Sequence, residues 1–176
     1  MNIAAGPFTI ASLLLVGAGA LKAWAPGDTA NALRAAGLPR ARVLVRIGGV
    51  VEVAIGAYAV LAGTRIAGAL VAASYLVFAA FVTLALTRDL PISTCGCFGK
   101  VDTPPSLVHV GVDAVAAIAG LAVVIDPGVA IGDVIDRQPL AGAPFLLLVA
   151  VGLYSAYLAL TLLPKNLAAV REARTG

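Results

Sequence analysis

The chain has 176 residues, of which 61% are hydrophobic and only 12% are charged, whereas ordinary soluble domains carry about 25% charged residues. The mean hydropathy of +1.02 excludes a soluble globular protein and predicts a protein embedded in a membrane. The isoelectric point near 9.1 does not indicate nucleic-acid binding, because the cations are spread over loops and helix ends instead of forming one basic surface.

Five apolar segments have the length of roughly 20 residues that a helix needs to cross a bilayer. The second and third segments are separated by only four residues, 62–65, so they must form an antiparallel helical hairpin. A short helix at the membrane interface is expected between the first and second segments. We therefore predict an all-α fold, a polytopic helical bundle in a single membrane domain over residues 1–176, with spans at about 8–24, 43–61, 66–86, 106–125 and 143–163.

Small residues at helical spacing allow helices to approach closely in lipid. This spacing predicts packing positions at Gly17 with Leu21, at Gly48 with Glu52 and Gly56, and at Ala69 with Ala73.

The distribution of Lys and Arg predicts the orientation, because cytoplasmic segments carry the excess of these residues. In a five-span topology all of the 12 cations except Arg65 and Arg137 fall on one side. We therefore expect the N terminus outside and the C terminus in the cytoplasm.

Ionisable residues inside a membrane cost roughly 2.5–3.5 kcal/mol each at mid-depth, so each is a candidate functional residue. Helix alternation places Lys22, Arg46, His109 and Asp113 at one end of the bundle, with Glu52 somewhat deeper. His109 and Asp113 are four residues apart on one helical face, where a carboxylate would fix the imidazole tautomer and support proton exchange. The alternative is that such residues form ion pairs, for example Lys22 with Glu52, that only hold helices together.

The only two cysteines, Cys95 and Cys97, lie at that same end in the connecting loop "STCGCFGKVDTPPS", residues 93–106. They could cycle between dithiol and disulfide, with Gly96 supplying the backbone freedom that so short a ring requires. They could instead bind a soft metal with His109 as a third donor, although two thiolates and one histidine are too few for a closed structural zinc site. The third reading is that they are inert, small hydrophobic residues.

The chain resembles the MauE family of methylamine-utilisation membrane proteins and, more widely, DoxX-like proteins. The resemblance is carried by "CGCFG" after the third span, by Lys22 in "GAGALKAW" and by Glu52 in "GGVVEVAIGAYAVLAG". It implies a DoxX-like four-helix core plus one further span, in the inner membrane of a bacterial cell.

The resemblance also implies a redox role in the maturation of a disulfide-containing exported client, together with a thioredoxin-like protein. In the methylamine metabolic process that client is the small subunit of methylamine dehydrogenase. On this reading Cys95 and Cys97 carry electrons in a thiol–disulfide or quinone-linked oxidoreductase, His109 and Asp113 move protons, and Lys22 and Glu52 shape a polar pocket. No cofactor is firmly implied, although DoxX-like relatives suggest membrane quinone. A non-catalytic assembly factor and a transporter of metal or a small solute are the alternatives.

Overall fold

The computed structural model describes residues 2–39, 41–90, 92, 105–164 and 166, and within these residues every regular element is a helix. Five helices are long and apolar enough to cross a membrane. They are α1 (Ala5–Trp24), α3 (Arg42–Ala62), α4 (Arg65–Thr87), α5 (Leu107–Ile125) and α7 (Ala143–Thr161). The shorter connecting helices are α2 (Gly27–Ala35), α6 (Ile131–Asp136) and the 3-10 helix η1 (Pro139–Gly142). The predicted fold class, an all-α polytopic membrane bundle, is confirmed.

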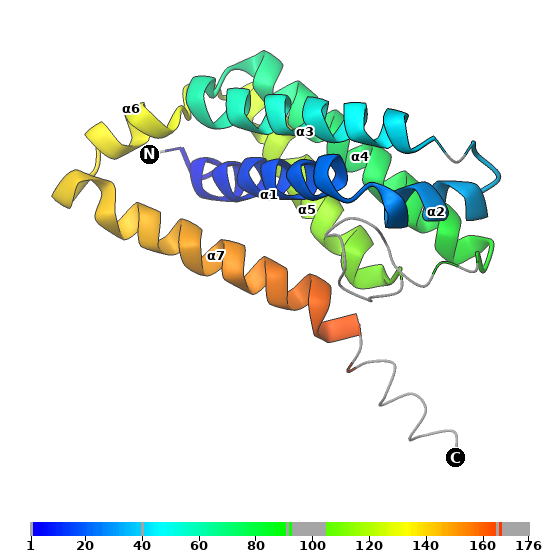
Figure 1. The fold of residues 1–176 in the computed structure, drawn as a ribbon. Coiled ribbons are helices and arrows are strands. Elements are labelled where there is room, and N and C mark those ends of the chain that lie inside the picture. Colours follow the sequence, from blue (N-terminus) through cyan, green and yellow to red (C-terminus); the bar gives the residue numbers. More distant parts are fainter. Residues whose placement is uncertain (1, 40, 91, 93–104, 165, 167–176) are drawn as a thin grey trace.

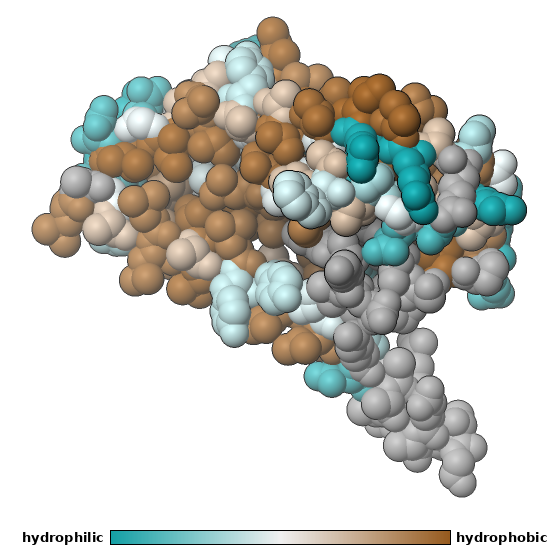
Figure 2. Space-filling model, in the orientation of Figure 1, coloured by the Kyte–Doolittle hydropathy of each residue, from teal (hydrophilic) through white to brown (hydrophobic). Residues whose placement is uncertain are grey.

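The outer surface of the bundle is apolar in its middle and polar at its ends. Figure 2 shows hydrophobic side chains over the middle of the molecule, with hydrophilic residues over α6 at one end and around α2 at the other. Ile118 is 65% exposed and Val151 is 55% exposed, although each lies in the middle of a long helix. Apolar side chains are stable in contact with lipid tails and need not be buried inside the bundle. This exposed apolar surface therefore supports insertion into a membrane.

The bundle is built from two closely packed helix pairs, α1 with α3 and α4 with α5 (Figure 1). Glycines make both contacts possible. A Cβ atom added at Gly49 would lie 2.5 Å from the carbonyl oxygen of Gly19, and one at Gly120 would lie 2.8 Å from the carbonyl oxygen of Gly68. The backbones therefore touch directly, as small residues permit in a membrane interior. The chain neighbours α3 and α4 contact each other much less.

Two of the three predicted sets of packing positions are wrong, and the third is right only in part. A Cβ atom at Gly17 or at Gly48 would meet no described atom within 4 Å, and Ala69 and Ala73 are exposed. Gly56 does contact α1, close to the carbonyl oxygen of Ser12. The physical reason is that successive residues of an α-helix are rotated by about 100° about the helix axis. Gly48 and its neighbour Gly49 therefore lie on different faces of α3.

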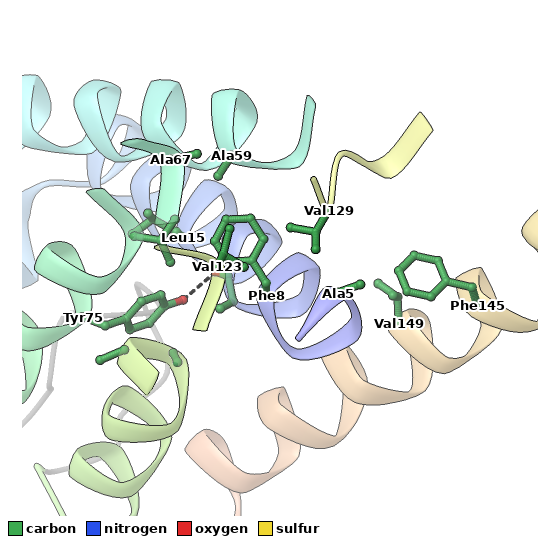
Figure 3. Close-up of a cluster of buried hydrophobic side chains, with 14 residues drawn as sticks. Ala5, Phe8, Leu15, Ala59, Ala67, Tyr75, Val123, Val129, Phe145 and Val149 are labelled. Carbon is green, nitrogen blue, oxygen red and sulfur yellow. Dashed lines mark hydrogen bonds between the residues drawn. The ribbon is translucent and has the colours of Figure 1, made fainter. Parts of the chain in front are cut away.

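The hydrophobic core surrounds α1 (Figure 3). Phe8, Leu15 and Val123 are completely buried. The hydroxyl of Tyr75 on α4 donates a hydrogen bond of 2.7 Å to the carbonyl oxygen of Ala11 on α1, drawn as the dashed line in Figure 3. This bond joins the two helix pairs across the core.

The end of the bundle opposite the predicted cysteine loop is tied together by backbone contacts. Gly63 ends α3 in the left-handed region, with φ +54°, and a Cβ atom there would collide with the backbone of Val129 and Ala130. The backbone N–H of Gly128 donates to the carbonyl oxygen of Gly63 at 3.0 Å. The side chain of Asn2 donates to the carbonyl oxygen of Asp126 at 2.7 Å. The α3–α4 turn, the end of α5 and the N-terminal segment are therefore fastened to one another.

Candidate functional site

An ion pair between α1 and α3 lies near one end of the bundle. Lys22 Nζ donates to both carboxylate oxygens of Glu52, each at 2.8 Å, and the two side chains are only 8% and 14% exposed. Each partner therefore satisfies the other, which is the condition for keeping two charges out of water. The ion pair named among the sequence alternatives is present.

The sequence places this ion pair by a reciprocal use of glycine. Gly19 lies one turn before Lys22 on α1, and Gly49 lies one turn before Glu52 on α3. A Cβ atom at Gly19 would lie 2.8 Å from Glu52 Cβ, and one at Gly49 would lie 3.1 Å from Lys22 Cβ. Each glycine leaves room for the charged residue of the other helix, so the two side chains can meet between the backbones.

Aromatic side chains of α4 extend the site from Lys22 into the core. Lys22 Nζ lies 4.2 Å from the centre of the Phe78 ring, a cation–π contact. The ring of Phe78 in turn packs edge-on against Tyr75, with 5.7 Å between the ring centres and 80° between the planes. Lys22 is therefore oriented by a carboxylate on one helix and an aromatic face on another.

The two candidate residues of α5, His109 and Asp113, are also buried and line a cavity together with Lys22. His109 is 3% exposed, and its Nδ1 lies 2.9 Å from the hydroxyl of Ser106, the residue that precedes the helix. Asp113 is 8% exposed, and its Oδ2 accepts no hydrogen bond from any residue that the structure describes. Among the hydrogen bonds of the described residues, the imidazole is joined to Ser106 instead of the expected Asp113.

A cavity of about 20 Å³ brings three of the predicted site residues together. This volume is enough for about one water molecule. Because a buried carboxylate oxygen without a partner is costly, a bound water is the simplest way to satisfy Asp113. The cavity is lined by Leu14, Ala18, Lys22, Tyr75, Phe78, His109, Val112, Asp113 and Leu160.

A second and larger hollow, which we call the α3–α4 groove, lies on the other side of the ion pair. Its volume is about 270 Å³. Lys22 and Phe78 line both the groove and the small cavity, so the two hollows are neighbours. The groove is lined by Lys22, Thr29, Leu33, Leu44, Val45, Gly48, Glu52, Val77, Phe78 and Phe81. Sequence reasoning did not identify Phe78 or Phe81, because an aromatic residue in a membrane span usually only packs against lipid or core.

The structure does not place the other predicted features, namely the two cysteines, Arg46 and a metal-binding group, in this site. Cys95 and Cys97 lie outside the described residues, so the redox, metal and inert readings of the thiols all stay predictions. Arg46 is exposed. Within the described residues no group of three or more His, Cys, Asp or Glu side chains could hold a metal ion.

The fold and the site together define a multi-pass helical membrane protein with a cluster of buried ionisable residues toward one end of its bundle. The family model of methylamine utilisation protein MauE matches residues 2–126, and the chain therefore belongs to the MauE family. The match extends from the start of the chain to the residue after α5, so it includes all six candidate residues, while α6, η1 and α7 lie beyond it. No curated protein and no solved structure matches the chain.

Proposed function

We propose that this MauE-family membrane protein supports thiol–disulfide exchange during maturation of a disulfide-containing exported client, together with a thioredoxin-like protein. The main supporting observation is that the buried ionisable residues Lys22, Glu52, His109 and Asp113 lie toward the end of the bundle where α4 ends and α5 begins. The "CGCFG" sequence connects those two helices. Methylamine dehydrogenase small subunit is the client to test first, given the family.

The proposed exchange uses Cys95 and Cys97 as the electron carriers. A thiolate of the client attacks one sulfur of their disulfide, a mixed disulfide forms, and the second client thiol displaces it. The client leaves oxidised, and Cys95 and Cys97 are left as two thiols. The oxidised thioredoxin-like protein then re-forms their disulfide by the same exchange and becomes reduced. The reverse sequence would reduce the client.

We propose that two residues of α5, His109 and Asp113, transfer the protons in this mechanism. Each thiol must lose a proton before its sulfur can attack, so a group that exchanges protons within the membrane is needed close to the loop. His109 and Asp113 lie in the first two turns of the helix that follows the loop, and both line a cavity of water size. Lys22, which is hydrogen-bonded to Glu52, lines the same cavity.

We also propose that the chain lies in the bacterial inner membrane with its N terminus outside and its C terminus in the cytoplasm. The excess of Lys and Arg at the cysteine end supports this orientation. An exported client would then exchange electrons across the membrane, or the loop would be reached from outside.

The deciding experiment is replacement of each cysteine, Cys95→Ser and Cys97→Ser, in cells that produce the client. We expect either variant to stop accumulation of the oxidised client, and the single remaining thiol to trap a mixed disulfide with the thioredoxin-like protein. Thr87→Ser, an exposed change at the end of α4, is the control. Normal client oxidation in both cysteine variants would refute the redox proposal and favour a non-catalytic assembly factor.

The side from which the thiols are reached is a separate measurement. A membrane-impermeant maleimide is applied to intact cells after reduction, and labelling of Cys95 and Cys97 is compared with labelling after lysis. Our orientation predicts labelling only after lysis. Labelling of intact cells would show that the loop is reached from outside.

A further inference from the structure

The hydroxyl of Ser106 does not cap α5, the helix that this residue precedes. A serine in this position usually accepts a hydrogen bond from a backbone N–H of the first turn. The Ser106 side chain forms no such bond, and the backbone N–H of His109 donates to the carbonyl oxygen of Ser106 at 3.0 Å. The hydroxyl lies instead 2.9 Å from Nδ1 of the His109 imidazole. A residue type that normally caps a helix therefore holds a buried ring here.

His109 and Asp113 lie on one face of α5, because they are four residues apart, and both line the cavity of about 20 Å³. In the part of the chain that the structure describes, no direct hydrogen bond joins them, and Asp113 Oδ2 is buried without a donor. Two polar groups on the walls of a water-sized space are commonly bridged by one water molecule. The cavity therefore has the size and the polar walls that one bridging water needs.

Two other polar residues line the cavity, Lys22 and Tyr75, and both donate hydrogen bonds elsewhere. Lys22 Nζ donates to both carboxylate oxygens of Glu52, each at 2.8 Å. The Tyr75 hydroxyl donates to a backbone carbonyl oxygen of α1 at 2.7 Å. Among the described residues that line the cavity, the imidazole of His109 is therefore the best-placed donor to a water that also contacts Asp113.

These contacts favour one tautomer of the imidazole. In a neutral imidazole one ring nitrogen donates and the other accepts. An ionised carboxylate only accepts, so a water that donates to Asp113 is best held by a ring nitrogen that donates to the water. The serine hydroxyl can donate or accept, and it therefore adapts to the nitrogen that it contacts. With hydrogen on Nε2, and with Nδ1 accepting from Ser106, all of these groups are satisfied.

We propose that Ser106, His109, one water molecule in the cavity and Asp113 form a continuous hydrogen-bonded chain. The Ser106 hydroxyl donates to Nδ1, Nε2–H donates to the water, and the water donates to Asp113 Oδ2. Ser106 is the positioning residue of this chain, because its hydroxyl fixes the tautomer of His109.

A proton can pass along this chain without movement of a side chain. When a proton reaches Ser106 Oγ, the hydroxyl gives its own hydrogen to Nδ1, Nε2 gives its hydrogen to the water, and the water gives one to Oδ2. One proton has entered, and the Asp113 carboxylate has become a neutral acid. That this transfer serves the thiols rests on the proposed function, whereas the chain itself does not.

The test uses the single histidine of the chain. Protein made with 13C,15N-labelled histidine and purified without a polyhistidine tag gives one signal for each ring nitrogen. Magic-angle-spinning NMR in lipid bilayers then identifies the nitrogen that carries hydrogen. We expect hydrogen on Nε2 alone, and transfer of magnetisation to that hydrogen from bound water. Hydrogen on Nδ1 or on both nitrogens, or no transfer from water, would overturn the proposal.

Replacement of Ser106 tests its positioning role. We expect Ser106→Ala to lower the ratio of the Nε2–H to the Nδ1–H tautomer about fivefold, the factor that corresponds to the loss of one hydrogen bond. Ser106→Thr keeps the hydroxyl and should keep the wild-type ratio. Ser155→Ala, a change at an exposed serine of α7, is the control. An unchanged ratio in Ser106→Ala would refute the role of Ser106.

Two measurements separate this chain from the thiol exchange. A Cys95→Ser/Cys97→Ser protein should give the wild-type histidine spectrum, because the chain needs neither cysteine, and a different tautomer there would overturn the proposal. Client oxidation by Ser106→Ala should fall by the same factor as the tautomer ratio and return in Ser106→Thr. If thiol exchange itself fails in the wild type, the spectra still decide whether the chain exists.

Discussion

The ion pair of α1 and α3 and the polar residues of α5 are both buried toward the same end of the bundle, yet their hydrogen bonding differs. Lys22 and Glu52 satisfy each other across two helices, whereas one carboxylate oxygen of Asp113 accepts no hydrogen bond from the part of the chain that the structure describes. A fully satisfied pair is a fixed part of the structure. A buried carboxylate with an unused acceptor is costly to retain, and such groups are typical of sites that exchange protons or bind water. The comparison therefore predicts that the first group stabilises the fold, and it agrees with the proton exchange that we propose for the second.

The largest effect should come from breaking the ion pair. Lys22→Met leaves the Glu52 carboxylate buried without its cation, so we expect a loss of about 3–5 kcal/mol in the free energy of unfolding. The measurement is steric trapping in bicelles. The double variant Lys22→Met/Glu52→Leu removes both charges and should recover most of the loss. A Lys22→Met protein as stable as wild type would show that the pair is not a structural clamp.

The next largest effect concerns the glycines that bring α1 and α3 together. Gly49→Ala places a methyl group against the backbone of α1, and we expect it to cost about 1–3 kcal/mol, as overpacking does in other cores. Gly48→Ala, one residue away in open space, is the matched control and should be neutral or slightly stabilising. Equal melting temperatures for the two variants would mean that the close backbone contact does not support the ion pair.

A smaller effect is expected from Tyr75→Phe, which removes the hydroxyl that donates to Ala11 on α1. The loss of one buried hydrogen bond should lower the free energy of unfolding by about 1 kcal/mol. The melting temperature measures this change. Tyr154→Phe is the control, because Tyr154 is 63% exposed on α7, and it should have no effect. A loss as large as that of Lys22→Met would show that Tyr75 does more than join two helices.

The smallest effect on stability is expected from Asp113→Asn, which keeps the shape of the side chain and removes its charge. We expect a change in the free energy of unfolding of less than about 1 kcal/mol, because no described residue donates a hydrogen bond to Oδ2 that the change would remove. If Asp113 moves protons, the rate of client oxidation should nevertheless fall roughly 100-fold, as for other acid–base groups. Glu52→Gln is the contrast, with a larger loss of stability. Normal client oxidation with Asp113→Asn would exclude the proton-transfer role.

The number and type of the long helices could be predicted from the sequence, because length and hydropathy alone decide which segments cross a membrane. The short helix after the first span could also be placed, since Gly37 has φ +82° just beyond it and glycine tolerates that conformation. Rotation about each helix axis could not be predicted in the same way. Apolar residues surround these helices on all sides, so hydropathy does not show which glycine faces a neighbouring helix.

The candidate site was predictable as a set of residues but not as an arrangement. A charged side chain in a membrane span is conspicuous, so Lys22, Glu52 and Asp113 stand out in the sequence. Which of them pair depends on the helix contacts that Gly19 and Gly49 create, and spacing along one chain does not contain that information. The sequence also favoured Asp113 as the neighbour of His109, while the hydroxyl of Ser106 is the group within hydrogen-bond distance.

The backbone contact between Gly63 and the Val129–Ala130 segment gives the bundle a pivot. The N-terminal segment, the α3–α4 turn and the end of α5 are all joined there, so these helices have little freedom at that end. Displacement then grows along their length: a tilt of about 5° over a helix of about 30 Å moves the far end by about 2.6 Å. Such a tilt would hardly disturb the joined end, but it would change the width of the α3–α4 groove and the separation of Lys22 from Asp113. This geometry predicts that helix motion is largest toward the end where Lys22, His109 and Asp113 lie.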